Sequence, residues 1–215
     1  MSLLDCYQQA AFDLLFKARS TQREAIQKAG KIVADAAMRG HHVYLHRICH
    51  SIEMDLYERG GGPVFYQLYK VEETELQPGD VLFVSSVSGR TIEVVNLAYD
   101  MVQAGVNVIA LTSMEYASAV EPVHESGKRL HEFATVALDN CAPAAEAMME
   151  VDGLEAKFAA ASGIASDFIM WSVTSVAVEK MLQEGCRPGI LKSFNFPGGG
   201  EYNEGLRERY KECGY

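Results

Sequence analysis

Cysteines, basic residues and long apolar runs are all scarce in this sequence of 215 residues. The five cysteines are odd in number, far apart and without a C-x-x-C pair, so they exclude a disulfide framework and a structural zinc site and predict reduced thiols in the cytoplasm. The most apolar stretch, residues 168–178, is too short to cross a bilayer, and the first residues lack the pattern of a signal peptide. We therefore expect no membrane partner.

Positive charge is also limited. Lysine and arginine number 19 against 29 aspartates and glutamates, which gives a formal net charge of −10. No basic run is longer than two residues, whereas a nucleic-acid-binding surface needs a dense basic face to displace counterions. The sequence therefore predicts no nucleic-acid partner, and an anionic ligand would have to be held by oriented backbone dipoles.

Hydrophobic residues make up 48% of the chain, which is enough for one well-filled core. Apolar residues recur at helical spacing from Leu3 to Ala18 and predict a first helix with one apolar stripe. A second helix is expected to begin at a capping box of Thr21 and Glu24 and to end near Gly40. We expect residues 1–40 to form a helical pair within the same domain as residues 41–215, with part of the first stripe in a subunit interface.

After this pair, short β-rich runs alternate with helical patterns. Residues 81–84 and 106–111 are continuously apolar, which is typical of strands covered on both faces, and a helical pattern at residues 91–104 lies between them. Such a βαβ unit predicts a parallel sheet. The fold class predicted is a three-layer α/β/α sandwich of flavodoxin-like type with a mostly parallel five-stranded sheet, whose strands are expected at residues 42–48, 64–69, 80–85, 106–112 and 134–138.

The rest of the chain is expected to hold a long helix at residues 160–184 and a glycine-rich irregular tail at residues 194–203. A short charged helix is expected at residues 204–211. The glycine-rich run at residues 60–63 is expected to be a loop inside the domain.

The run S-S-V-S-G-R-T at residues 85–91 lies between an apolar strand and a helix. Its hydroxyl groups, a glycine that allows close backbone approach, and the unpaired N–H groups of the helix start form a site suited to phosphate. The alternative interpretation is a simple helix cap with Ser88 as the N-cap residue. Four hydroxyl groups in seven residues exceed what one cap requires.

These residues resemble the sugar-phosphate-binding loop of the sugar isomerase (SIS) domain family, and A-L-T-S at residues 110–113 fits the same pattern. Further segments resemble a phosphoheptose-isomerase-like subfamily, namely residues 22–26, 138–143, 153–157 and the tail S-x-N…G-G…N at residues 193–203. The resemblance implies a phosphorylated sugar or amino sugar as ligand and a site shared across a homodimer or homotetramer. We expect no cofactor. It assigns phosphate binding to Ser85, Ser86, Ser88, Gly89 and Thr91, with Ser51 contributing from a neighbouring loop.

Two departures from the family pattern stand out. The subfamily has Gly-x-Gly-His-Ser after its first strand, whereas this chain has Arg47, Ile48 and Cys49 before His50 and Ser51. Phosphoheptose isomerases carry a catalytic histidine on the long helix, where this chain has Phe168. The binding mode and the source of proton transfer are therefore expected to differ from those of the isomerases.

Aldose–ketose isomerisation needs a carboxylate or histidine beside the open-chain sugar. A helix expected at residues 52–59 would present Asp55 and Glu58 on one face, so these are the leading catalytic carboxylates, with His50 as polar partner. The alternative is a surface ion pair between Asp55 and Arg59. Asn140, after the last strand, is a candidate for binding sugar hydroxyls or a turn residue.

Other polar groups carry weaker predictions. Four histidines, at positions 41, 42, 46 and 50, lie near Cys49 but lack the spacing of a tetrahedral site, so no metal is expected. In the tail, Asn195, Glu201 and Asn203 are expected to close over a site or to be disordered, and Lys192 to assist a phosphate or to be solvated.

Two functions remain open at this level. One is a sugar-phosphate isomerase acting through an enediol, and the other is a non-catalytic sensor of a sugar phosphate. A dinucleotide-binding domain is disfavoured because no G-x-G-x-x-G follows an early strand.

Overall fold

The computed structural model describes residues 1–215 and contains one parallel five-stranded sheet in the order β2-β1-β3-β4-β5. All five predicted strands are present, each shorter than expected. Their bounds are β1 Val43–His46, β2 Tyr66–Leu68, β3 Val81–Ser85, β4 Asn107–Thr112 and β5 Val136–Asp139.

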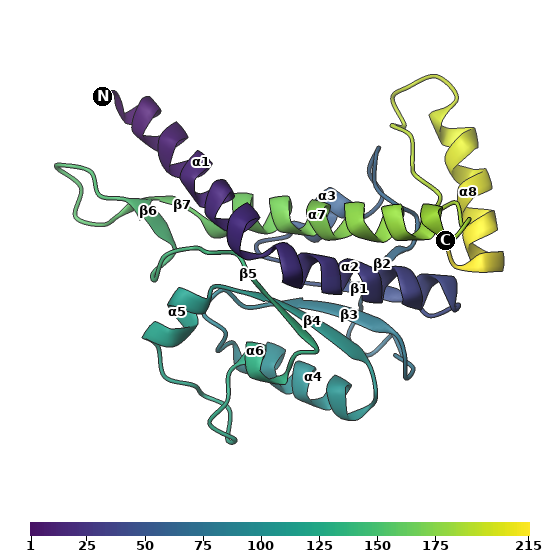
Figure 1. The fold of residues 1–215 in the computed structure, drawn as a ribbon, viewed down its shortest axis with the longest axis horizontal. Coiled ribbons are helices and arrows are strands. Elements are labelled where there is room, and N and C mark those ends of the chain that lie inside the picture. Colours follow the sequence, from purple (N-terminus) through teal and green to yellow (C-terminus); the bar gives the residue numbers. More distant parts are fainter.

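Helices cover both faces of the sheet, which confirms the predicted three-layer sandwich (Figure 1). On one face lie α2 (Arg23–Met38) and α7 (Ser162–Gln183), and on the other lie α4 (Ile92–Gln103) and α6 (Leu130–Phe133). Alternate residues of β3 serve the two layers, because Val81 and Phe83 pack with α2 and α7 whereas Leu82 and Val84 pack with α4. The continuous apolar run of β3 is thus explained by burial on both sides.

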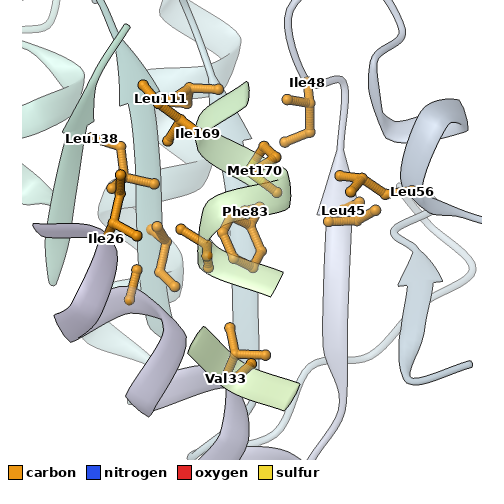
Figure 2. Close-up of a cluster of buried hydrophobic side chains, with 14 of the residues drawn as sticks. Ile26, Val33, Leu45, Ile48, Leu56, Phe83, Leu111, Leu138, Ile169 and Met170 are labelled. Atoms are coloured by element: carbon orange, nitrogen blue, oxygen red, sulfur yellow. The ribbon is translucent and has the colours of Figure 1, made fainter. Parts of the chain in front are cut away.

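The larger core lies between the sheet and α7. Figure 2 shows Ile169 and Met170 of α7 close to Leu111 and Phe83 of the central strands, with Ile26 and Val33 of α2 beside them. Helix α2 approaches α7 at Gly30, where a Cβ atom would come within 2.5 Å of the Val176 Cβ. The two helices therefore pack as one layer.

The predicted N-terminal helical pair is present as α1 (Leu3–Thr21) and α2. Only Ala11, Leu14 and Ala18 of α1 are buried, and the N-terminal part of the helix projects from the body of the molecule (Figure 1). The expected capping box at Thr21 is wrong. Thr21 is still the last residue of α1, its hydroxyl donates to the Lys17 carbonyl oxygen, and a capping box is formed by Ser2 and Asp5 instead.

Two expectations about local structure are corrected, and some elements were missed. The helix expected at residues 52–59 is only α3 (Glu53–Leu56), because the chain turns to an extended conformation at Tyr57 and a left-handed one at Glu58. The final helix, α8 (Gly199–Cys213), begins five residues earlier than expected because Asn203 holds its first turn against Lys192. A hairpin of β6 (Ala147–Met149) and β7 (Phe158–Ala160), and the short helix α5 (Met114–Ala119), were not predicted.

None of the helices combines the length and apolar character that a transmembrane helix needs.

Candidate functional site

The strand order places a topological switch point between β1 and β3. From β1 the chain leads to β2 on one side, and β3 and the later strands lie on the other. In open parallel sheets, ligands bind outside the carboxyl ends of the strands at such a point. The loops that follow β1 (residues 47–52) and β3 (residues 86–91) flank it, and they contain most of the residues singled out from the sequence.

The loop after β3 is closed on itself by hydroxyl groups. The Oγ atoms of Ser86 and Thr91 lie 2.8 Å apart, and the Thr91 amide donates to Ser86 Oγ over 3.2 Å. The amides of Val87, Ser88 and Arg90 make no hydrogen bond within the chain. Unbonded amides next to the first turn of α4 give this loop the partial positive charge that suits an anion.

Thr91, not Ser88, is the N-cap residue of α4, and its side chain makes no capping hydrogen bond. The simple-cap interpretation of Ser88 is therefore wrong. The Ser88 side chain is half-buried in the turn, and its hydroxyl has no partner within the chain.

Gly89 is required by the turn itself. Its φ is +66°, and a Cβ atom there would lie 3.2 Å from the Ala117 Cβ and 3.3 Å from Thr112 Oγ1. Its carbonyl oxygen accepts from the Leu130 amide at 2.9 Å. The glycine thus lets the loop pack against β4 and α5, a physical reason different from the close ligand approach expected from the sequence.

Ser85 ends β3 and is 8% exposed. It lies on the same face of the strand as Phe83, toward the layer of α2 and α7. Its Oγ atom is buried and has no hydrogen-bond partner. Buried hydroxyls are normally satisfied, so this one is a group with capacity to bind a ligand oxygen.

The loop after β1 has an unusual backbone. Four of its residues have left-handed φ values, +44° at Arg47, +31° at Cys49, +58° at His50 and +77° at Ser51. This is the segment in which the resembling subfamily carries glycines, and the chain here adopts glycine-like conformations with larger residues. The carboxylate of Glu53 accepts from the Ile48 amide at 2.8 Å and holds the loop, a role that was not evident from the sequence.

His50 and Ser51 are exposed in this loop. Asn140, in contrast, is fully buried behind it. Its Nδ2 atom donates to Ser166 Oγ of α7 at 3.3 Å and lies 3.9 Å from Cys49 Sγ, and its Oδ1 atom accepts from the Ala142 amide. Asn140 therefore joins the ends of β1 and β5 to the first turns of α7.

Two carboxylates, those of Asp55 and Asp167, interact electrostatically. Asp55 is exposed and pairs with Arg59, as the alternative interpretation of the sequence proposed. Asp167 of α7 has a buried Oδ1 atom without a partner. Burial raises the pKa of Asp167, the negative charge of Asp55 raises it further, and Arg59 opposes both.

Sequence reasoning missed Asp167. It lies 112 positions from Asp55, and no local motif marks it. The only available signal was its position next to Phe168, which replaces the isomerase histidine.

Glu58 does not share a helix face with Asp55, so that part of the sequence prediction is wrong. Its carboxylate pairs with Arg207 of α8 at 3.2 Å. Both residues line a cavity of about 260 Å³ between α8 and the edge strand β2, together with Tyr57, Tyr66 and Tyr210. Glu58 is therefore directed toward α8.

The tail is anchored at Asn203, whereas residues 194–198 are exposed. Asn203 is fully buried, and its side-chain amide bonds to both the amide and the carbonyl of Lys192 at 2.9 Å. The Lys192 ammonium lies 4.0 Å from the centre of the Tyr202 ring. Asn195 and Glu201 are exposed. Asn203 thus holds α8 in place from inside the protein.

The histidines near the site are dispersed. His46 is buried at the end of β1, where burial and then Arg47 lower its pKa, and its ring lies edge-on to Tyr69 at 5.3 Å. His42 Nδ1 lies 3.0 Å from the Tyr210 hydroxyl. No three histidine, cysteine or acidic side chains are grouped in a way that would hold a metal ion.

The strand order and the loops at the carboxyl ends of β1 and β3 are features by which this chain can be compared with known proteins. The family model for the SIS domain matches residues 65–113, from β2 through the serine-rich loop to the end of β4. Three solved structures share the fold. The NanR protein of Vibrio vulnificus complexed with ManNAc-6P matches with a TM-score of 0.54 and 16% identity, over 98% of this chain and 68% of that chain. The sugar isomerase domain of an RpiR transcription factor from Sphaerobacter thermophilus matches with a TM-score of 0.55 and 14% identity over 99% of both chains. Phosphoheptose isomerase GmhA from Neisseria gonorrhoeae matches with a TM-score of 0.53 and 12% identity, over 81% of this chain and 94% of that chain.

Relatives that match along the whole length identify the family. A UPF0309 protein of Shouchella clausii is 31% identical over 98% of both chains, and one of Oceanobacillus iheyensis is 32% identical over 87% of this chain and 88% of that protein. The chain belongs to the UPF0309 family of SIS-domain proteins.

Proposed function

We propose that the protein binds a phosphorylated sugar or amino sugar at the switch point, with the phosphate in the loop after β3. The observation that carries this proposal is the set of unbonded amides of Val87, Ser88 and Arg90 in the loop that precedes α4. A net charge of −10 repels anions at long range, so only such local dipoles can attract one. Phosphate binding is assigned to the hydroxyl and backbone groups of Ser85, Ser86, Ser88, Gly89 and Thr91.

The buried hydroxyl of Ser85 supports the same proposal. It lies beneath this loop with no partner, so a ligand oxygen would satisfy it. Ser51 would contribute from the loop after β1, on the other side of the switch point. Asn140 would act on the sugar through the loop that it holds.

The reaction proposed is an aldose–ketose isomerisation through an enediol. The Asp55 carboxylate removes the proton from the carbon next to the carbonyl and returns it to the neighbouring carbon, and His50 moves the hydroxyl proton between the two oxygens. The Asp55 carboxyl holds that proton between the two steps. Asp167 is a further carboxyl within electrostatic reach of Asp55, and burial and then the Asp55 charge raise its pKa. Glu58 is a second candidate base, but its carboxylate is engaged with Arg207.

A non-catalytic sensor is the second candidate. Two observations favour it, the ion pair that occupies Asp55 and the phenylalanine at position 168 where phosphoheptose isomerases have a catalytic histidine. Two structures with the same fold are described as NanR complexed with ManNAc-6P and as the sugar isomerase domain of an RpiR transcription factor. A sensor would bind the sugar phosphate at the same loop and leave it unchanged.

One experiment separates binding from turnover. Thermal shift with inorganic phosphate and a panel of sugar 6-phosphates tests binding, and Ser88→Ala together with Ser86→Ala should reduce the stabilisation. The ligand that stabilises most is then incubated in D2O, and deuterium at its carbon-bound positions is measured by NMR. Exchange that is lost in Asp55→Asn supports the isomerase, and stabilisation without exchange supports the sensor. If no phosphate compound stabilises the protein, the proposed function is wrong.

We also propose that the protein acts in the reducing cytoplasm as a homodimer or homotetramer. All five cysteines are free, as a reducing compartment requires. The exposed apolar side chains of the N-terminal helix support self-association.

A further inference from the structure

The outer face of α1 carries two large aromatic side chains that nothing in the chain covers. Phe12 and Phe16 are each 68% exposed, whereas the buried residues of the helix lie on its opposite side. Figure 1 shows this helix leaving the body of the molecule at its N-terminal end. Exposed aromatic rings grouped on one helix face are typical of a surface that binds a partner.

The charges on this face are arranged symmetrically around Phe12. Asp5, Phe12 and Arg19 follow one another at intervals of seven residues, so they lie in one line along the helix. A carboxylate stands at one end of the line and a guanidinium at the other. Arg19 makes no ion pair within the chain, and the Asp5 carboxylate bonds only to Ser2.

We propose that α1 forms the interface of a two-fold symmetric dimer in which two copies of α1 pack antiparallel, with Phe12 at the symmetry axis. In this register Asp5 faces the partner's Arg19, and the symmetry repeats the pair at the other end. A parallel arrangement would place like charges together. The inference gives a surface and a register to the proposed homo-oligomer, and it is independent of the sugar-phosphate chemistry.

The dimensions permit this pairing. Seven residues of helix rise about 10 Å, and packed helices lie about 8–10 Å apart, so aspartate and arginine side chains reach across at both ends. A groove of about 390 Å³ adjoins this face of α1. Leu15 of α1 and Trp171 of α7 line it, together with the carboxylate-bearing Asp167. Its apolar residues offer area on which the partner's side chains would be buried.

Charge reversal tests the register. Dimerisation of the full chain without ligand is measured by sedimentation over a wide concentration range. Asp5→Arg and Arg19→Asp should each weaken the dimer about tenfold, because each creates two like-charge pairs. The double variant should recover the dimer. Recovery could not come from a more stable helix. The reversed charges oppose the helix macrodipole, and the double variant still lacks the capping interaction of Asp5, so both effects destabilise α1. Only pairing across the interface explains a recovery of the dimer.

A second pair of variants tests the surface. Phe12→Glu should give a monomer with native circular dichroism, because two carboxylates would meet at the axis. The matched control is Phe196→Glu, which should leave the dimer intact. Phe196 is 69% exposed and lies three residues before α8, which Figure 1 shows at the opposite end of the molecule from the N-terminus. A monomeric wild-type protein, a dimer that survives Phe12→Glu, or a double charge reversal without recovery would each overturn the proposal. A loss of sugar-phosphate binding would not affect it.

Discussion

Replacing Gly89 by alanine tests whether the phosphate loop is held by packing as well as by its turn. The residue has φ +66°, and a left-handed conformation costs a non-glycine residue about 1–2 kcal/mol. The new methyl group would also lie 3.2 Å from Ala117 and 3.3 Å from Thr112, so the loop or its neighbours must move by a few tenths of an ångström. Overpacking of this kind costs roughly 1–3 kcal/mol.

Gly127 provides a matched control. Its φ is +70°, but nothing lies within 4 Å of its Cβ position. Gly127→Ala should therefore lose only about 1–2 kcal/mol of unfolding free energy. Gly89→Ala should lose roughly 2–5 kcal/mol, the two costs taken together. Urea unfolding of the three proteins measures both changes.

The same pair of variants links the packing of the loop to binding. Movement of the loop displaces the amides of Ser88 and Arg90, so Gly89→Ala should bind inorganic phosphate at least about tenfold more weakly by calorimetry, which corresponds to about 1.4 kcal/mol. Gly127→Ala should bind it as the wild type does. If the two variants lose equal stability, or if phosphate affinity is unchanged in Gly89→Ala, the packing argument is refuted.

Three further predictions follow from the titratable groups and the tail. Asp167→Asn removes a carboxylate whose pKa is raised in the folded state, so the variant should be more stable than the wild type at neutral pH. The difference in stability should shrink as the pH falls through the raised pKa. A difference in Tm that does not change with pH would contradict this. His46 has a lowered pKa, so the folded state resists its protonation and the wild type should lose stability as the pH falls below about 6.5. The His46→Gln variant should lose less stability over the same pH range. Urea midpoints at neutral and mildly acidic pH measure both changes. Asn203→Ala removes two hydrogen bonds between a buried side chain and the Lys192 backbone, so it should cost about 2 kcal/mol and expose the tail to protease. Asn195 is exposed, so Asn195→Ala should change neither stability nor proteolysis; equal behaviour of the two variants would show that Asn203 does not hold the tail.

The sequence alone was enough to predict the layers of the protein. Runs such as residues 81–84 and 108–111 are apolar without a break, and with their short length and their Val and Ile content they are typical of strands covered on both faces. The serine-rich loop could be located because it follows such a strand and precedes a helix. These are local properties, since periodicity and turn chemistry act over a few residues. Where the local pattern was weak, as in β6, β7 and the single turn of α3, the prediction failed.

Which side chains meet was decided only by the tertiary structure. The Asp55 charge raises the pKa of Asp167, Glu58 pairs with Arg207, and Asn140 bonds to Ser166 because segments distant in the sequence are packed together. The left-handed backbone of Arg47 and Cys49 is likewise maintained by surrounding contacts, because the residues themselves disfavour it. A sequence pattern specifies which face of an element is buried, but the partner on that face depends on the packing of the whole chain. For this reason the fold could be predicted from the residues, and the partners of its charged groups could not.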